Sequence, residues 1–178
     1  AEPRYRVRFY FDPNGLVMAG GDAHYIFQGY AGSSTTVVQV EFRFLGGYQV
    51  RASAINDAGG WTDTNWVSIA DGPHFVELDW RAATGAGANN GALSFWVDGL
   101  AQGGLATLDN DTRRVDRVRL GTVAGLDGGT RGFARDSRAI RTLVEEREQN
   151  VHRMDRPAPG QGLPGDVVRL KVRPKEAV

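Results

Sequence analysis

The sequence predicts an all-β fold, an antiparallel sandwich or barrel, from residue 4 to about residue 120. Apolar and polar residues alternate there with a period of two, which is typical of half-buried strands. Turn signals separate these runs about every 8–12 residues, and no helical period occurs before Gly132. The chain also holds 24 glycines in 178 residues, nearly twice the ordinary share of about 7%. Many short strands joined by tight turns account for all three observations.

Four strands are predicted in the first part of the chain. Tyr5, Val7, Phe9 and Phe11 alternate with polar or charged neighbours until the turn at residues 12–15. The next three runs cover residues 24–30, 38–44 and 49–54. The last two of these are joined through Gly46-Gly47, and a two-glycine connection is a strong hairpin signal.

Four more strands follow, and together the eight define an apolar face. They cover residues 65–69, 74–81, 93–97 and 114–123, and Asp98-Gly99 ends the third of them. The alternation predicts that one face of these runs packs into a single core. The residues expected to point inward are Val7, Phe9, Val40, Phe42, Val76, Leu78, Phe95 and Val97.

The composition changes after Gly132, which predicts a domain at residues 1–132 and a charged extension at residues 133–178. Residues 1–130 carry a net charge of −4 and residues 131–178 a net charge of +4. Asp136 or Ser137 is a candidate cap for a helix over residues 137–154. A Gly/Pro loop follows, and then residues 167–172 alternate like one further strand. We expect that strand to pair with a sandwich edge, either its own or a neighbour's, which would give a homo-oligomer by strand exchange.

Composition also excludes several classes of function. The chain has no cysteine, so it has no disulfide, no thiolate zinc site and no cysteine nucleophile. Lysine and arginine balance aspartate and glutamate at 21 each, which argues against a nucleic-acid partner, because such proteins carry a basic excess. No stretch reaches the roughly 18 apolar residues of a membrane span.

Several segments resemble the laminin-G-like branch of the concanavalin A-like jelly rolls, in a bacterial-type, non-catalytic form. The matching stretches are residues 5–12, 24–27, 74–81, 93–99, 111–116 and 120–121, and the Phe95-Trp96-Val97-Asp98-Gly99 hairpin is the most specific. The resemblance covers about residues 4–132 and implies a two-sheet antiparallel β-sandwich, a jelly roll, here followed by the C-terminal helix and added strand. Residues 132–137 depart from the family's closing strand, and residues 167–172 are the candidate replacement.

One pair of carboxylates invites an enzymatic interpretation. Laminarinase-like hydrolases of this fold carry a glutamate, an aspartate two residues later and a second glutamate, and Glu77 and Asp79 are similar to the first two. Hydrolysis of a glycoside needs a second acid, but the residues after Asp79 supply none. Cross-strand ion pairing is the alternative for these side chains.

The polar positions of the strands are expected to gather on one sheet face, which is the candidate ligand site. Amides, guanidinium groups, carboxylates and aromatic rings suit sugars, which offer paired hydroxyls and apolar ring faces. The candidates are Tyr10, Arg43, Arg51, Glu77, Asp79, Arg81 and Trp96 on strands, with Trp61 and Trp66 in a polar loop. Mutually neutralising charges on a solvated sheet are the alternative interpretation.

A calcium site is a further candidate. Asp109 and Asp111 lie in an Asp/Asn-rich loop, and Asp22, Asp57, Asp63 or Asp127 in other loops could also supply oxygen ligands. Carboxylate oxygens are the ligands that calcium prefers, although such residues also form turns. Apart from this calcium, no cofactor is expected.

The sequence as a whole predicts an extracellular or cell-surface module that binds carbohydrate or a surface protein and is not an enzyme. The alternative is a self-assembling structural subunit that uses its C-terminal arm. A weak laminarinase-like glycoside hydrolase is the third interpretation. The resemblance implies the extracellular location.

Overall fold

The computed structural model describes residues 2–130, and these residues form ten strands in two antiparallel sheets. The strands are β1 (Arg4–Phe11), β2 (Ala23–Ala31), β3 (Thr35–Phe44), β4 (Tyr48–Ile55), β5 (Trp61–Asp63), β6 (Val67–Ile69), β7 (His74–Arg81), β8 (Gly91–Val97), β9 (Leu100–Leu108) and β10 (Arg117–Ala124). The predicted helix at 137–154, the predicted strand at 167–172 and the boundary after residue 132 lie outside the described residues.

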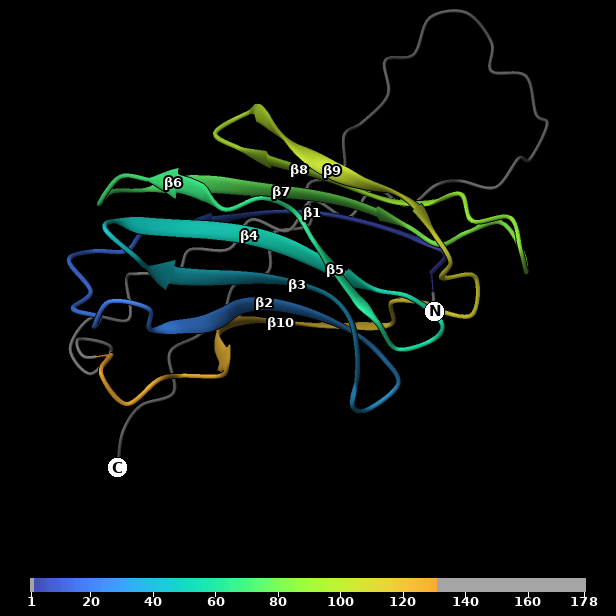
Figure 1. Cartoon of the computed structure of the whole chain (residues 1–178), viewed down its shortest axis with the longest axis horizontal. Coiled ribbons are helices and arrows are strands. Elements are labelled where there is room, and N and C mark those ends of the chain that lie inside the picture. The colour runs from blue at the N-terminus through green and yellow to red at the C-terminus, as the bar shows by residue number, and fades with distance from the viewer. Residues whose placement is uncertain (1, 131–178) are drawn as a thin grey trace, which may run out of the picture.

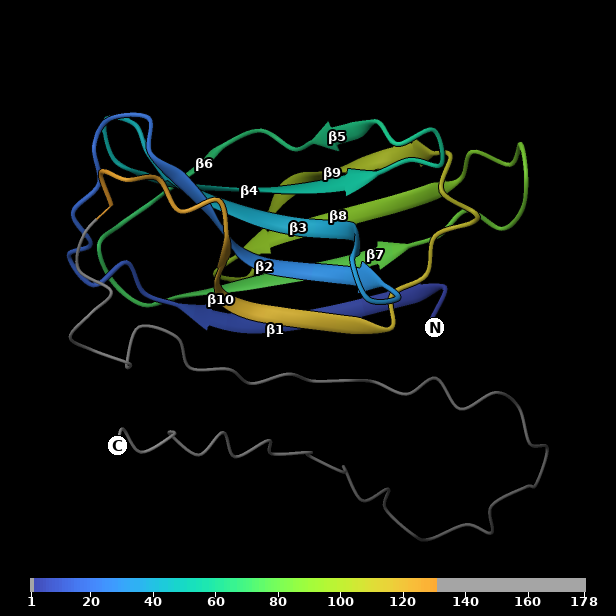
Figure 2. The same ribbon diagram turned by 90° about the horizontal axis from the view of Figure 1, so that it is seen from below.

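The two sheets pack face to face as a β-sandwich of the jelly-roll type (Figure 1). One sheet has four strands in the order β1-β7-β8-β9. The other has six strands in the order β10-β2-β3-β4-β5, with β6 also paired to β4. Figure 2 shows the six-stranded sheet in front of the four-stranded one, with the strands of both layers running in similar directions. The predicted two-sheet antiparallel sandwich is therefore confirmed.

The core lies between the sheets and uses the predicted residues. All eight side chains expected to face inward are buried: Val7, Phe9, Val40, Phe42, Val76, Leu78, Phe95 and Val97. Aromatic rings join the layers, because Phe9 of β1 stacks on Phe27 of β2 with ring centroids 5.6 Å apart. Within the described residues no helix is long and apolar enough to cross a membrane.

Two strands, β5 and β9, were not predicted from the sequence. β9 reads poorly as a strand because it contains Gly103-Gly104, which lowers strand propensity. Gly104 is required there, since a Cβ atom would lie 2.5 Å from the carbonyl oxygen of Leu93 on β8. β5 is only three residues long, and it places Trp61 at the start of a strand rather than in the loop where it was expected.

Candidate functional site

The predicted ligand residues lie on two separate surfaces, which corrects the expectation of a single polar face. Glu77, Asp79 and Trp96 lie on the outer face of the four-stranded sheet, as do Tyr10 and Arg81. Arg43 and Arg51 lie on the outer face of the six-stranded sheet. In a two-layer sandwich each sheet has its own solvent side, so strands with the same alternation can present polar residues in opposite directions.

A charged row crosses three strands of the six-stranded sheet. Glu41 of β3 is directly opposite Arg51 of β4, and the Arg51 guanidinium donates to Glu41 Oε2 at 2.8 Å. The same guanidinium donates to Asp63 Oδ2 of β5 at 2.7 Å. One arginine therefore holds two carboxylates side by side.

Trp66 lies beside this row, in the connection between β5 and β6. The guanidinium carbon of Arg43 is 3.8 Å from the centroid of the Trp66 ring, and that of Arg51 is 4.5 Å from it. Arg43 also donates through Nε to the side chain of Gln49, on β4, at 2.7 Å. The indole is thus half-buried beneath two oriented cations rather than presented as an open platform for a sugar ring.

Tyr25 of β2 extends the same surface, opposite Glu41 in the β2–β3 register. Burial and the nearby Glu41 carboxylate raise the pKa of Tyr25, and Arg51 opposes this shift. The Gln39 side chain also lowers this pKa in part, but the overall shift is upward, so the phenol stays protonated at neutral pH.

A chain of buried amides continues from Tyr25 along β2 and β3. Gln28 donates to the side-chain oxygen of Gln39 at 3.1 Å and accepts from the Tyr30 hydroxyl at 2.6 Å. Both glutamines are buried although they lie on the outer face of their sheet. Buried amides with partners are fixed in orientation, which is what specific recognition of hydroxyl groups requires. We call Tyr25, Gln39, Glu41, Arg43, Arg51, Asp63 and Trp66 the Trp66 face.

The sequence analysis did not propose Tyr25 or Gln28 for this face. The register of β2 shifts between Tyr25 and Phe27, so the period-two pattern breaks at Ile26. Tyr25 and Gln28 consequently share a face although they are three residues apart. The two consecutive apolar residues Ile26 and Phe27 are the sequence feature that could have indicated this register shift.

On the four-stranded sheet, Glu77 and Asp79 of β7 are engaged by arginines of the neighbouring strand β1. Arg6 and Arg8 of β1 donate to the two oxygens of Glu77 at 3.1 Å and 2.8 Å. Arg4 binds Asp79 through two hydrogen bonds, of which that from Nε is 2.9 Å. This is the cross-strand ion pairing that the sequence analysis offered as the alternative to catalysis. The groups that contact the two carboxylates here are guanidinium groups and not a second carboxylic acid.

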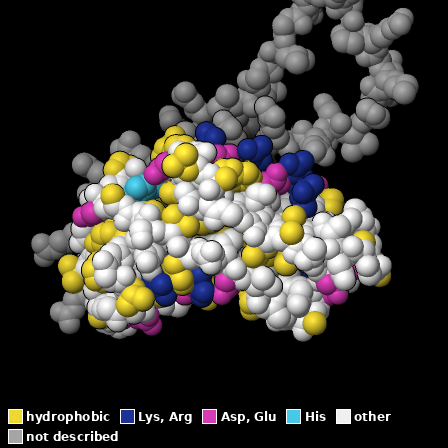
Figure 3. All heavy atoms as spheres, turned by 45° about the horizontal axis from the view of Figure 1, so that its top comes forward, with side chains coloured by type: hydrophobic (Ala, Val, Ile, Leu, Met, Phe, Trp, Pro, Cys, Tyr) yellow, Lys and Arg dark blue, Asp and Glu magenta, His cyan; other side chains and the backbone are white. Residues whose placement is uncertain are grey.

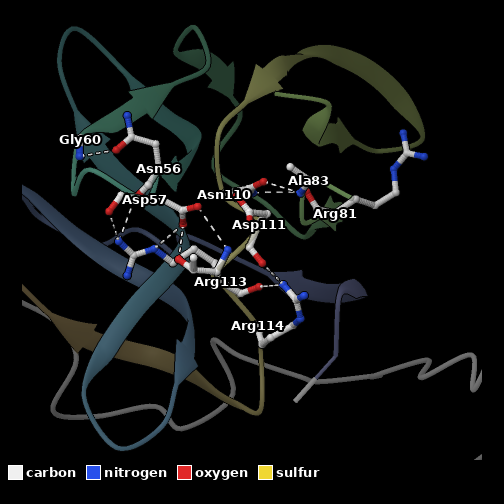
Figure 4. Close-up of polar contacts among 10 residues, drawn as sticks. Asn56, Asp57, Gly60, Arg81, Ala83, Asn110, Asp111, Arg113 and Arg114 are labelled. Atoms are coloured by element: carbon white, nitrogen blue, oxygen red, sulfur yellow. Dashed lines mark hydrogen bonds and ion pairs between the residues drawn. The ribbon is translucent and has the colours of Figure 1, made fainter. Parts of the chain in front are cut away.

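The predicted calcium residues, Asp109 and Asp111, meet a third aspartate, Asp57. Figure 4 shows Asp57 and Asp111 among the polar contacts of this region. Oxygen atoms of Asp57, Asp109 and Asp111 all lie within 4.8 Å of one another. Desolvation and the neighbouring Asp57 carboxyl raise the pKa of Asp111. Desolvation would also raise the pKa of Asp57, but hydrogen bonds from Thr112 and the charge of Arg113 lower it overall. Among the described residues, these three carboxylates form a group that could hold a cation, and calcium stays a prediction.

Comparisons with known proteins give a likeness in fold. No family model and no curated protein matches the chain. Among solved structures, the chain is similar to a polysaccharide lyase of family 18, aly-SJ02, with a TM-score of 0.37 and 13% identity over 58% of this chain and 47% of that one. It is also similar to an alginate lyase from Alteromonas sp. 272, with a TM-score of 0.37 and 13% identity over 61% of this chain and 48% of that one.

Both matched structures are enzymes, and the chain spans about half of their length. They contradict the predictions that the chain is a non-catalytic binding module and that it is not an enzyme. Neither match bears on the self-assembling alternative. At 13% identity the shared feature is the fold, and the activities belong to those proteins; a function for this chain depends on its own site.

Proposed function

We propose that this domain is a polysaccharide-cleaving enzyme and that the Trp66 face is its active surface. The observation that supports this most is the placement of two guanidinium groups over Trp66, beside paired carboxylates and a protonated tyrosine. Enzymes need such charged groups fixed before the substrate arrives, because reorienting them during the reaction costs free energy.

Binding on this face would come from Arg43 and from the amide side chains near it. A guanidinium carries five N–H donors in one plane and suits vicinal hydroxyls or a carboxylate of a sugar. Trp66 acts as a positioning residue, since the two arginines are stacked on its ring. Sugar contacts then fall to the guanidinium groups and not to the indole.

Tyr25 is the candidate acid. Breaking a glycosidic bond requires a proton for the departing oxygen, whether the reaction is hydrolysis or elimination. A phenol with a raised pKa keeps its proton at neutral pH. Glu41, directly across from Tyr25, is the carboxylate nearest in register to accept a proton from the substrate or from water.

Two further parts of this account are proposals. We infer kinship with the laminin-G-like branch from the segments quoted above, within the broader jelly-roll class. An extracellular location fits a polysaccharide substrate. The two lyases named above act on polysaccharides of their own, and a lyase reaction is one form that cleavage could take here.

The test is product formation on a panel of neutral and acidic polysaccharides. We expect new reducing ends with at least one polymer, and ultraviolet absorbance of a carbon–carbon double bond if the bond breaks by elimination. Arg43→Gln should abolish product formation. Arg114→Gln, which removes the same charge in the 109–116 loop, should not. Absence of product from every polymer, or equal activity of both variants, would refute the proposal.

A further inference from the structure

The outer face of the four-stranded sheet carries a row of arginines on the side of the sandwich opposite the Trp66 face. Arg4, Arg6 and Arg8 occupy alternate positions of β1, and Arg81 of β7 lies directly opposite Arg4. Figure 3 shows Lys or Arg side chains in a row there with acidic side chains beside them. We call these four residues the arginine row.

The row has more positive charge than its partners neutralise. Its four cations face two carboxylates, Glu77 and Asp79, which leaves a charge of +2 over β1 and β7. Asp98, at the end of this face, is engaged by His74 and by the backbone N–H of Phe75. Residues 1–130 together carry −4, so the arginine row is a local positive region on an acidic body.

The guanidinium groups remain accessible despite their ion pairs. The side chains of Arg4, Arg6 and Arg8 keep 43%, 48% and 40% of their surface exposed. Alternate residues of a strand are about 6.6–6.8 Å apart, so Arg4, Arg6 and Arg8 together extend along about 13 Å of β1. A linear polymer with several anionic groups can span this length, whereas a small anion contacts only part of it.

Next to the row lies an aromatic residue, Trp96 of β8. On β8, Trp96 is opposite Glu77 and Ser94 is opposite Asp79. Gly104 of β9 is opposite Ser94 on the other side of β8. The Arg6 guanidinium carbon lies 5.9 Å from the Trp96 ring centroid. An indole beside oriented cations offers an apolar surface for sugar rings as well as charge for their acidic groups.

We propose that the arginine row and Trp96 form a second binding surface, for a linear acidic polysaccharide with carboxylate or sulfate groups. A nucleic acid has a far denser charge and calls for a strong basic excess, whereas this body is acidic overall. This surface is separate from the Trp66 face, and a polysaccharide can bind to it without being cleaved. It would hold an acidic chain on one side of the domain while the Trp66 face, on the other side, cleaves its substrate.

The experiment measures binding of polygalacturonate by calorimetry, with dextran as the neutral polymer. The double variant Arg6→Gln/Arg81→Gln removes the excess charge of +2 from the arginine row. In this variant Arg8 can still pair with Glu77, and Arg4 can still pair with Asp79. The control Arg114→Gln/Arg119→Gln removes the same charge outside the row. We expect the first variant to bind polygalacturonate about tenfold more weakly, the control to bind like the parent, and dextran not to bind.

Three outcomes would overturn the proposal. Equal affinity of the arginine-row variant and the parent would show that the row is not the site. Equal loss in both variants would show a response to net charge only, and tighter binding of single-stranded DNA than of polygalacturonate would assign the row to nucleic acid. Trp96→Ala should weaken binding in the same assay. Polysaccharide cleavage by the row variant tests the Trp66 face independently, so either site can fail alone.

Discussion

Arg43 stacks on Trp66 with its guanidinium carbon 3.8 Å from the centre of the indole ring. The two residues come from β3 and from the β5–β6 connection, which are separated by the whole of β4 in the sheet. Their contact therefore ties a connection to the outer face of the sheet. It also fixes a cation where a flexible side chain would otherwise sample many rotamers.

Replacing Trp66 should affect activity more than stability. Trp66→Leu removes the ring on which Arg43 and Arg51 rest, at a cost of about 0.5–1 kcal/mol per cation–π contact. We expect a fall in kcat/KM of about tenfold or more, because misplaced charges stabilise the transition state poorly. Urea unfolding and kinetics measured on the same sample check this. A variant that loses stability in proportion to activity would contradict it.

Glu77 should prove structural. Glu77→Gln removes a carboxylate that accepts from both Arg6 and Arg8, so we expect a loss of about 1–3 kcal/mol in the free energy of unfolding. Polysaccharide cleavage by the folded variant should match that of the parent. Loss of cleavage without loss of stability would place the active site on the four-stranded sheet, as the laminarinase-like interpretation requires.

His24 should make the fold sensitive to acid. Its side chain is buried at 1% exposure against the Phe42 ring, and desolvation lowers its pKa to about 4, against an opposing effect of Asp127. An unfolded histidine titrates near 6.5, so between these values the unfolded chain binds more protons. Stability should fall by about 2–3 kcal/mol from pH 7 to pH 4.5.

The matched variant is His24→Phe, which keeps an aromatic ring at the site and removes the titrating group. Urea unfolding at both pH values should show a smaller decrease for this variant than for the parent. An identical decrease in the two proteins would assign the acid sensitivity to other groups.

Calcium should stabilise the end of the sandwich near Asp57. The three carboxylates within 4.8 Å repel one another, and a bound cation would remove that repulsion and stabilise the folded state by mass action. We expect a higher Tm in calcium than in a chelator, and no such difference for Asp109→Asn. A parent Tm that is the same with calcium and with chelator would eliminate the site.

The fold could be predicted from sequence because alternation and turn chemistry both act locally. Val40, Phe42, Val76 and Leu78 follow a strict period of two, so their common face was readable without a structure. The Asp98-Gly99 hairpin was readable as well, since both residues adopt positive φ, at 52° and 79°. β9 was missed because Gly104 is required by close packing on β8, a long-range constraint that the local pattern does not contain.

The site was only partly predictable. Arg43, Arg51 and Trp66 were named, but Glu77 and Asp79 were placed with them, because alternation gives the face of a strand and not the sheet to which the strand belongs. Tyr25 was hidden by the register shift in β2. Which residues meet across strands depends on strand order, and the sequence alone did not provide that order.

The central claim is that Tyr25 donates the proton on the Trp66 face, and Tyr25→Phe tests it most directly because this change removes one oxygen and keeps the ring. The measurement is the rate of chain cleavage on the best polysaccharide substrate, together with the affinity for that substrate. We predict that cleavage falls by about 100-fold or more while binding and Tm stay close to those of the parent. A Tyr25→Phe variant that cleaves at the parental rate would contradict the account.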